Sequence, residues 1–278
     1  DGIAYSRLDV RDTAGLRAVV DGAEHVVHLA SAHLEVNAPE ALYRSINVDA
    51  AERLVALCHE LGVRRLVHTS SVGIYGHVRH PPAREDSEAN PQTIYERTKL
   101  EGERRALAKA REVGQDIIVL RPGWVYGPGC PRTLKLARSL RKRLFFYVGS
   151  GANLRHPIYV DDLVRAYLLA LEAPGTLAGR VFVIAGDRPV TLKEYITTFT
   201  GVLEAPTPWL RIPRPAAWLL GAGAELAFGV FGGDPPFSRR SLGFFANDSA
   251  FDISAARADL GFHPTVGLEE GLTRTLRS

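Results

Sequence analysis

Tyr95 and Lys99 are the two residues whose types and spacing first suggest chemistry. They lie four residues apart in "IYERTKLEGE" (94–103), so a helix through this stretch would carry both side chains on one face. A lysine cation close to a phenol favours the phenolate and brings the pKa of the tyrosine towards neutral pH, where it can exchange a proton. Because this spacing is also common on solvated helices, the pair needs support from its surroundings.

Hydroxyl side chains just upstream supply that support. Thr69, Ser70 and Ser71 end the apolar run "RRLVHTSS" (64–71), and α/β folds place their sites at the carboxyl ends of parallel strands. A serine hydroxyl there could hold a substrate oxygen beside the phenol while a hydride moves at the adjacent carbon. A nicotinamide cofactor carries such a hydride, so these residues predict an enzyme that interconverts a secondary alcohol and a ketone.

The elements that would position these side chains are indicated by short apolar runs alternating with helical patterns. Such alternation predicts an α/β fold with a buried parallel sheet. We expect strands at 25–30, 64–71, 116–122 and 180–186, with a weaker one at 2–10, and helices at 47–63 and 91–114.

The second half of the chain departs from this alternation. A helix is expected within 159–175, another at 190–201 that begins with a capping box of Thr191 and Glu194, and a short one within 251–264. We therefore predict an incomplete dinucleotide-binding core at 1–155. Residues 156–278 would add the sheet-completing strand near 180–186 and a small, mainly helical substrate lobe.

The stretch 214–233 is an unusually apolar helix. Its large residues are Trp218, Leu219, Leu220 and Phe228. Such a helix could roof a hydrophobic pocket, touch a membrane surface, or lie buried between the lobe and the sheet, and burial is the simplest of the three interpretations.

Composition narrows the classes of function. The 278 residues are 46% hydrophobic with a net charge of +3, so a nucleic-acid partner is not expected. No run of eighteen apolar residues predicts an integral membrane span. Cys58 and Cys130 have no metal-ligand spacing, so we expect no metal site, and a reducing, cytoplasmic compartment is the simple interpretation.

Eight segments resemble, in order, those of the extended short-chain dehydrogenase/reductase superfamily, the NAD-dependent epimerases and dehydratases. They are "LDVRD" (8–12), "VVHLAS" (26–31), "NVDAAERLV" (47–55), "RRLVHTSSVGIYG" (64–76), "YERTK" (95–99), "LRPGWVYGPG" (120–129), "HPIYVDDLVRA" (156–166) and "LGFHPTVGLEEGL" (260–272). The resemblance covers essentially the whole chain. It implies a Rossmann-type doubly wound sheet, NAD or NADP as cofactor, a small-molecule substrate, and a homodimer formed through the helices at 47–61 and 92–112.

The resemblance also implies roles for single residues. Tyr95 would be the general acid/base, Lys99 would lower its pKa and bond the nicotinamide ribose, and Ser71 is favoured over Ser70 as the active hydroxyl. Trp124 and His156 would contact substrate. The residues expected along the cofactor are Asp9, Val10, Leu29, Ala30, Ser31, Asn47, Thr69, Tyr95, Lys99, Pro122, Gly123 and Val125.

Several other polar residues are interpreted as structural. His28 and His68 lie within apolar runs and are expected to pack in the core. Asp161 and Asp162 are expected to start a helix and to pack against the lobe, and not to act as catalysts.

One departure from the family pattern concerns the cofactor. No glycine-rich GxxGxxG turn precedes residue 12, so the chain resembles the family from its third strand onward. We expect a preceding segment to carry that turn, in which case the chain beginning at Asp1 would bind NAD(P) poorly and be inactive. The strand at 2–10 would then not pair directly with 25–30. The residue that separates NAD from NADP would lie in the same segment, so the sequence does not choose between them.

The carboxy-terminal part narrows the branch of the family. Residues 235–264 resemble the 3β-hydroxysteroid and sterol dehydrogenases more than the sugar-nucleotide epimerases. The leading hypothesis is therefore an oxidoreductase for a sterol-like or other apolar substrate. The alternatives are a sugar-nucleotide epimerase or dehydratase, and a non-catalytic dinucleotide-binding module. The presence of Ser71, Tyr95 and Lys99 argues against the last.

Overall fold

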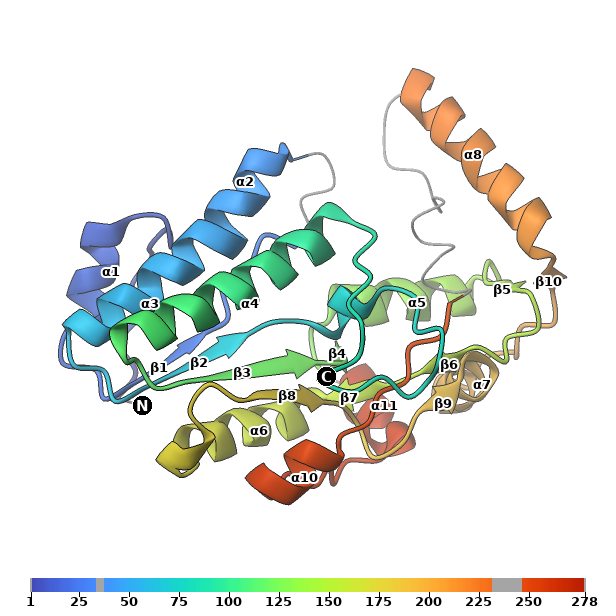
Figure 1. Cartoon of the computed structure of the whole chain (residues 1–278). Coiled ribbons are helices and arrows are strands. Elements are labelled where there is room, and N and C mark those ends of the chain that lie inside the picture. The colour runs from blue at the N-terminus through green and yellow to red at the C-terminus, as the bar shows by residue number, and fades with distance from the viewer. Residues whose placement is uncertain (1, 34–37, 232–246, 278) are drawn as a thin grey trace.

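A four-stranded parallel sheet forms the centre of the molecule. The computed structural model describes residues 2–33, 38–231 and 247–277 (Figure 1). The strands of the sheet are β1 (His25–His28), β2 (Arg65–Thr69), β3 (Ile117–Pro122) and β8 (Val181–Ile184), and they lie in that spatial order. All neighbouring pairs are parallel. The α/β class and the four main strands are therefore confirmed.

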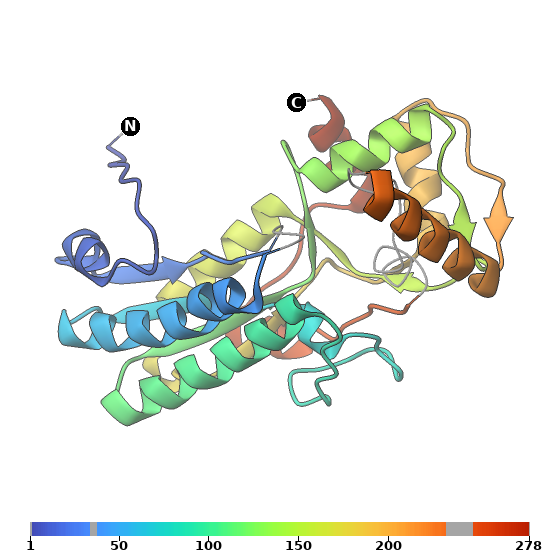
Figure 2. The same cartoon turned by 90° about the horizontal axis from the view of Figure 1, so that it is seen from above.

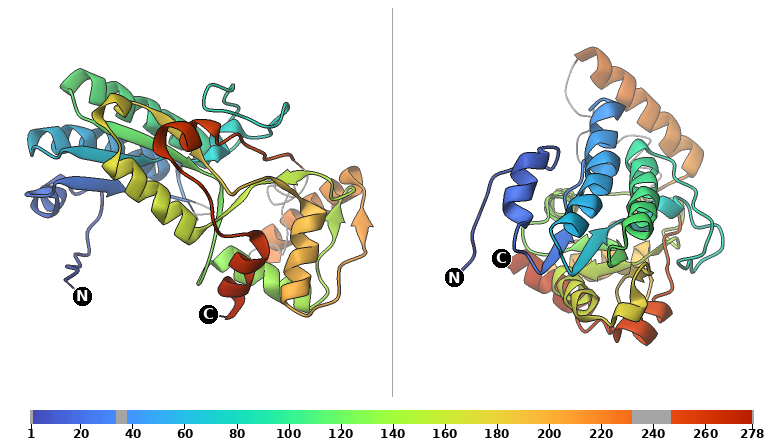
Figure 3. Two further views of the ribbon diagram at one scale, coloured as in Figure 1. Left: turned by 90° about the horizontal axis from the view of Figure 1, so that it is seen from below. Right: turned by 60° about the vertical axis from the view of Figure 1, so that its left-hand side comes forward.

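Helices cover both faces of this sheet. One face carries α1 (Thr13–Val20), α3 (Ala50–Glu60) and α4 (Ile94–Val113), and the view from above shows α3 and α4 side by side (Figure 2). The other face carries α6 (Val160–Glu172) and α10 (Ser254–Leu260), as Figure 3 shows from below. This arrangement buries the strands on both sides, which explains their continuous apolar sequences.

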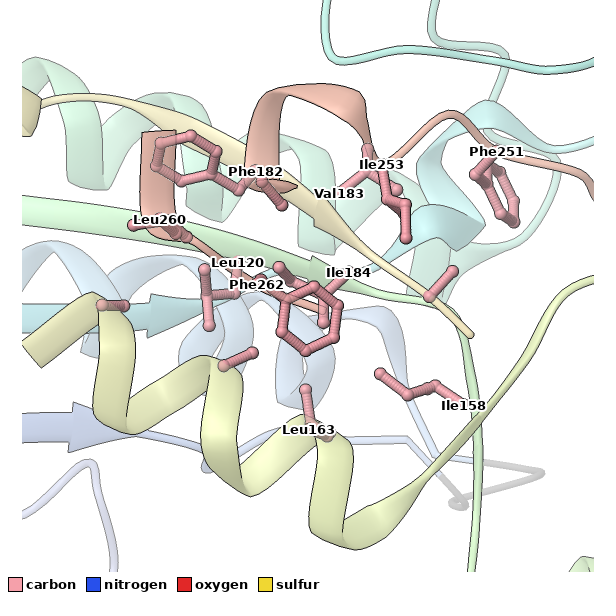
Figure 4. Packing of buried hydrophobic residues seen from close by; sticks show 14 of the residues in the cluster. Leu120, Ile158, Leu163, Phe182, Val183, Ile184, Phe251, Ile253, Leu260 and Phe262 are labelled. Atoms are coloured by element: carbon pink, nitrogen blue, oxygen red, sulfur yellow. The ribbon is translucent and has the colours of Figure 1, made fainter. Parts of the chain in front are cut away.

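The two faces have separate apolar cores because successive strand residues point to opposite sides. Leu66, Ile117 and Val119 pack towards the helices α3 and α4. On the other face Leu120 and Ile184 of the sheet lie with Leu163, Leu260 and Phe262 of the covering segments (Figure 4). Each of these side chains is almost fully buried, so the sheet is fixed by packing on both sides.

The helix that carries Tyr95 and Lys99 has clear start and stop signals. Thr93 caps it, since its hydroxyl accepts from the backbone N–H of Glu96, and the Glu96 carboxylate accepts in return from the Thr93 backbone. Gly114 ends it in the left-handed conformation, with φ of 80°. These signals fix where α4 begins, and therefore where Tyr95 lies relative to the sheet.

Helix α3 is preceded by a short helix and a widened helical turn. α2 (Glu40–Arg44), the π-helical η1 (Ser45–Asp49) and α3 follow one another without a break. The helix predicted at 47–63 thus begins earlier and includes a widened turn. Stretches with this hydrogen-bond pattern are rare and occur often at functional sites.

The strand predicted at 2–10 is not formed. Residues 2–9 adopt no regular structure, and Ile3 and Tyr5 are exposed. Within the described residues β1 pairs only with β2, so segment 2–9 has no strand beside it to satisfy its backbone groups. Alternating apolar residues alone do not hold an extended segment in place.

The remaining part contains the helices expected at 190–201 and 214–233, two helices at 131–141 and 268–277 that were not expected, and several small sheets. The helices are α5 (Pro131–Arg141), α7 (Leu192–Val202), α8 (Arg214–Phe231) and α11 (Leu268–Arg277), and short turns form η2 (Val72–Tyr75) and η3 (Gly175–Leu177). The two-stranded pairs are β4 (Trp124–Tyr126) with β7 (Pro157–Tyr159), β5 (Tyr147–Val148) with β10 (Arg211–Ile212), and β6 (Leu154–Arg155) with β9 (Val190–Thr191).

Two expectations for this part need correction. The Thr191 hydroxyl caps α7, but the Glu194 carboxylate pairs with Arg188, so only half of the predicted capping box is seen. The start of α8 is not buried: Trp218, Leu219 and Leu220 are exposed, and the helix rises away from the sheet in Figure 1. Phe228 lies outside the residues whose side chains are described. Apolar composition suggested burial, but among the first residues of the helix Ala217 is the one that packs in a described apolar cluster, with Val148.

Candidate active site

Ser71 and Tyr95 meet at the carboxyl edge of the sheet. Ser71 follows β2 and Tyr95 lies in the first turn of α4. The Ser71 hydroxyl accepts from the backbone N–H of Gly73 at 3.0 Å, which orients it. A Cβ built on Gly73 would lie 3.1 Å from Ser71 Oγ and 3.9 Å from the Tyr95 ring, so the two side chains share this small space.

The environment of Tyr95 favours its neutral form. Burial raises the pKa of the phenol, and hydrogen bonding by Ser71 and the charge of Arg132 oppose this rise only in part. The direction is opposite to the lowering expected from Lys99. The depth of the side chain, which the sequence does not reveal, decides the balance. With this raised pKa the tyrosine holds its proton at neutral pH.

Lys99 is the buried cation of the candidate site, with 3% of its surface exposed. Its Nζ donates to the backbone carbonyl of Thr69, at the end of β2. Burial lowers the pKa of Lys99 to about 8, although Glu103 acts in the other direction. Lys99 and Tyr95 do lie on one helix face, as their spacing predicts.

Two histidines from neighbouring strands lie beside this lysine. His28 and His68 occupy paired positions on β1 and β2, and both are buried, as expected for packed residues. Burial, and next the charge of Lys99, lower the pKa of His28 to about 4 and that of His68 well below its usual value. Both imidazoles are therefore neutral at pH 7.

Asn47 joins three segments of the site. Its Oδ1 accepts from the backbone N–H of Ala32 at 2.8 Å and from the Ser31 hydroxyl at 3.2 Å. Its Nδ2 donates to Thr98 Oγ1 on α4 at 3.0 Å. Asn47 was expected along the cofactor, and the structure gives it a positioning role between the loop after β1 and the helix of Tyr95.

Sequence reasoning missed the small residues that allow this contact. A Cβ on Gly102 would lie 1.9 Å from the backbone oxygen of Asn47, so α4 approaches η1 more closely than any other residue would permit. Thr98 was also missed. Neither residue stands out in a single sequence, because a glycine or threonine on a charged helix has many uses.

Thr69 faces two ways at the end of β2. Its carbonyl receives Lys99, while its hydroxyl shares a hydrogen bond of 2.8 Å with the phenol of Tyr167 on α6. Burial raises the pKa of Tyr167 to about 12. Tyr167 is a second tyrosine close to the site that the sequence did not single out.

The segment after β3 passes very close to its neighbours. A Cβ on Gly123 would lie 2.8 Å from the backbone oxygen of His156, so the segment that Pro122 begins requires glycine here. Val125 is half-buried beside the core, and the Trp124 ring packs on that of Tyr195 with centroids 4.8 Å apart. These residues line the carboxyl end of β3, where they were expected.

His156 is held by two backbone hydrogen bonds, and its expected contact with substrate stays a prediction. It is buried, its Nε2 bonds the backbone oxygen of Gly186 at 2.8 Å, and its Nδ1 accepts from the backbone N–H of Phe251 at 3.2 Å. Both ring nitrogens are thus occupied by backbone. Burial lowers the pKa of His156 to about 4, so it is neutral at pH 7.

The acidic pair at the start of α6 is structural, as expected. Asp162 is buried and accepts from the backbone N–H groups of Thr265 and Val266, each at 3.1 Å. Asp161 is exposed and pairs with Arg274. Asp162 therefore holds the chain segment that leads into α11.

The residues expected near the adenine of the cofactor have fewer contacts with the catalytic residues than the residues described above. Leu29 is exposed just after β1, at the same sheet edge as Ser71, and Ala30 and Ser31 follow it. Asp9 is exposed and pairs with Arg11 at 2.6 Å, next to Val10. Within the described part of the chain no hydrogen bond or ion pair joins Asp9 to Ser71, Tyr95 or Lys99, so its cofactor role stays a prediction.

The described residues contain no cluster of histidine, cysteine and acidic side chains arranged for a metal ion. Among the same residues, no helix is long and apolar enough to cross a membrane.

Comparison with known proteins decides the family. The sequence profile of the NAD-dependent epimerase/dehydratase family matches residues 3–185. The chain belongs to this family. It is accordingly an NAD(P)-dependent oxidoreductase or epimerase.

Three members of the family show how similar this chain is to proteins of known activity. The 2-alkyl-3-oxoalkanoate reductase of Stenotrophomonas maltophilia (strain K279a) is 29% identical over 98% of this chain and 86% of its own length. The 3beta-hydroxysteroid-dehydrogenase/decarboxylase isoform 1 of Arabidopsis thaliana is 28% identical over 99% of this chain, which spans 66% of the plant protein. The structure of UDP-glucose 4-epimerase with UDP-glucose from Thermotoga maritima superposes with a TM-score of 0.77 at 24% identity, covering 98% of this chain and 82% of that one. The last similarity establishes the Rossmann-type fold.

The residues present fit the nicotinamide end of the family's cofactor. A buried cation, a phenol and a serine hydroxyl converge at one strand end, and the buried hydroxyl of Ser70 has no partner within the described part of the chain. Lys99 and Tyr95 would hold the ribose next to the nicotinamide, and Ser71 would face the substrate.

Proposed function

We propose that this family member is an NAD(P)-dependent oxidoreductase that interconverts a ketone and a secondary alcohol on an apolar substrate. The observation that carries the proposal is the meeting of Ser71 and Tyr95 beside the buried Lys99 at the carboxyl edge of the sheet. The same residues serve both directions of the reaction, ketone reduction and alcohol oxidation.

Tyr95 acts as the proton donor in this proposal. Its raised pKa keeps the phenol protonated, so it can donate to the substrate oxygen as negative charge develops there. The Ser71 hydroxyl, held by Gly73, orients the same oxygen. When bound, the nicotinamide supplies the hydride. Lys99 is fixed against Thr69 and stabilises the phenolate left after proton transfer.

The apolar substrate class is supported by the names of two relatives. One name specifies a 2-alkyl-3-oxoalkanoate and the other a 3beta-hydroxysteroid, and both place the reacting oxygen on a largely hydrocarbon molecule. Trp124 and Val125, which follow the carboxyl end of β3, are half-buried apolar side chains suited to such a molecule.

The test is a substrate panel on the full-length protein, followed by nicotinamide absorbance. 3-Oxoalkanoates and 3-oxosteroids should oxidise NADH or NADPH, and Tyr95→Phe should lower turnover by about 10²–10⁴ while leaving cofactor affinity nearly unchanged. Tyr5→Phe, at an exposed tyrosine, is the matched control. Conversion of UDP-sugars without net change in absorbance would replace this proposal by an epimerase. A Tyr95→Phe variant with most of its turnover intact would refute the assignment of the proton donor.

A further inference from the structure

One surface of the lobe combines exposed aromatic and aliphatic side chains with positive charge. The pairing of β5 with β10 brings the loop after α5 next to the start of α8, and Ala217 of α8 packs against Val148 of β5. We call this the basic–apolar surface. Its apolar members are between 44% and 85% exposed: Leu144, Trp209, Leu210, Trp218, Leu219 and Leu220.

Basic residues predominate in the two segments that form this surface. Residues 131–152 contain six lysines and arginines, residues 205–224 contain two arginines, and neither segment contains an aspartate or glutamate. The net charge of the whole chain is only +3, which conceals this local excess. Four of the basic side chains, Arg138, Arg141, Lys142 and Arg143, are exposed at the end of α5 and in the loop behind it.

Six large apolar side chains are exposed on this surface. Soluble proteins rarely expose several large apolar side chains together unless they bind something there. Tryptophan side chains favour the boundary between water and lipid, and basic residues beside an apolar helix face are attracted to anionic headgroups. We propose that the basic–apolar surface docks on an anionic lipid bilayer, lying on it and not spanning it.

The alternative occupant, a second copy of this chain, is disfavoured by charge. A symmetric contact would place the same patch of each subunit face to face. The basic residues of both copies would then oppose one another, with only Glu204 and Glu225, just beyond the two ends of the second segment, to offset them. An anionic bilayer provides the complementary charge.

The position of this surface connects it to the active site. α5 begins at Pro131, and the charge of Arg132 already acts on the Tyr95 phenol. The helix ends at Arg141 on the docking surface, about 15 Å away at 1.5 Å per residue. Docking would therefore hold the site close to the lipid, which suits an apolar substrate drawn from it. This last step rests on the proposed function, whereas docking itself does not.

Vesicle binding without substrate tests docking separately from catalysis. The protein should float with vesicles of phosphatidylcholine and phosphatidylglycerol at low salt and much less with phosphatidylcholine alone. Two of the chain's three tryptophans lie in this surface, so their emission should shift to the blue on anionic vesicles, and added salt should reverse both effects. Absence of binding to anionic vesicles at low salt would overturn the proposal.

Matched variants locate the binding surface. Arg141→Glu with Lys142→Glu should weaken anionic-vesicle binding at least about 25-fold, since each basic residue contributes roughly fivefold. Arg79→Glu with Arg104→Glu, at exposed sites elsewhere, makes the same change in net charge as a control. Trp209→Ser with Trp218→Ser should also weaken binding, unlike Val164→Ser with Leu168→Ser, which are 50% and 52% exposed on α6. Equal binding by surface and control variants would overturn the assignment, and so would a dimer in light scattering that the surface variants dissociate.

Discussion

The imidazole of His68 stacks on that of His28 across two adjacent strands, with ring centroids 5.3 Å apart and planes inclined by 30°. Neither ring nitrogen of His68 has a hydrogen-bond partner in the described part of the chain. The pair forms a neutral floor under the cation of Lys99. Charging either ring would place a second positive charge beside the buried lysine.

Acid should therefore destabilise the protein at unusually mild pH. His28 and His156 have folded-state pKa values of about 4, that of His68 is lower still, and an unfolded histidine titrates near 6.5. As pH falls from 6.5 towards 4 the unfolded chain binds more protons than the folded chain. Each histidine then costs about 1.4 kcal/mol of unfolding free energy per pH unit.

Urea unfolding between pH 7 and pH 4.5 measures this effect. His68→Leu should reduce the pH slope by about one proton, whereas replacement of the exposed His263 by leucine should leave it unchanged. A His68→Leu variant with the slope of the parent protein would contradict the prediction.

Lys99→Met should trade activity for stability. In the folded state the pKa of Lys99 is about 8, against 10.5 normally, so the unfolded chain binds more protons between these values. The cost of burying the cation is thus present below pH 8 and disappears as pH rises towards 10.5. The variant should be about 1–2 kcal/mol more stable at pH 7, after allowing for the lost hydrogen bond to Thr69.

Denaturant curves of parent and Lys99→Met at pH 7 and near pH 10 test the sign. The stability advantage of the variant should shrink as pH rises, while turnover and cofactor affinity are both lost at every pH. The Lys99→Arg variant stays charged over this range, so the difference in stability between Lys99→Arg and Lys99→Met should not shrink as pH rises. A pH-independent difference between methionine variant and parent would rule out the buried cation as its cause.

Gly102→Ala should damage the fold beyond any effect on helix propensity. The new methyl group would overlap the backbone oxygen of Asn47, from which a Cβ would lie 1.9 Å. We expect a loss of about 1–3 kcal/mol, together with lower turnover because α4 carries Tyr95. Gly201→Ala is the control: its site on α7 is open, so alanine should stabilise by about 0.5–1 kcal/mol. Equal stability of the two variants in urea would disprove the close contact.

The expected homodimer would use the outer faces of α3 and α4, and the structure shows these faces to be charged. Arg105 pairs with Glu101 and Glu52 there, and Arg44 also pairs with Glu101. We therefore predict a dimer whose association weakens with salt. Light scattering at low and high salt measures this, and a monomer at both would count against it.

The sequence predicted those parts of the fold that depend on local patterns. Buried β-branched runs located all four strands of the main sheet, and the spacing of Tyr95 and Lys99 placed both on one helix face. The reversed pKa of Tyr95 was not predictable, because it depends on how deeply α4 is covered. The burial expected for the apolar start of α8 was wrong for the same reason. Composition indicates how much a residue prefers burial, but it does not indicate whether another part of the chain covers that residue. Thr98, Gly102 and Tyr167 acquire meaning only from contacts between distant segments.

The π-helical turn at Ser45–Asp49 makes the protein sensitive to a kind of genetic change that amino-acid replacement does not sample. Loss of a single codon within this turn would leave an unbroken, regular helix through 40–60. Everything before the deletion would then be rotated by about 100° relative to α3, one residue's share of a helical turn. Asn47 would no longer reach both Ala32 and Thr98. A one-residue deletion that leaves the helix content unchanged would thus break the hydrogen bonds that Asn47 makes between the two segments of the site. A compensating insertion nearby should restore these hydrogen bonds.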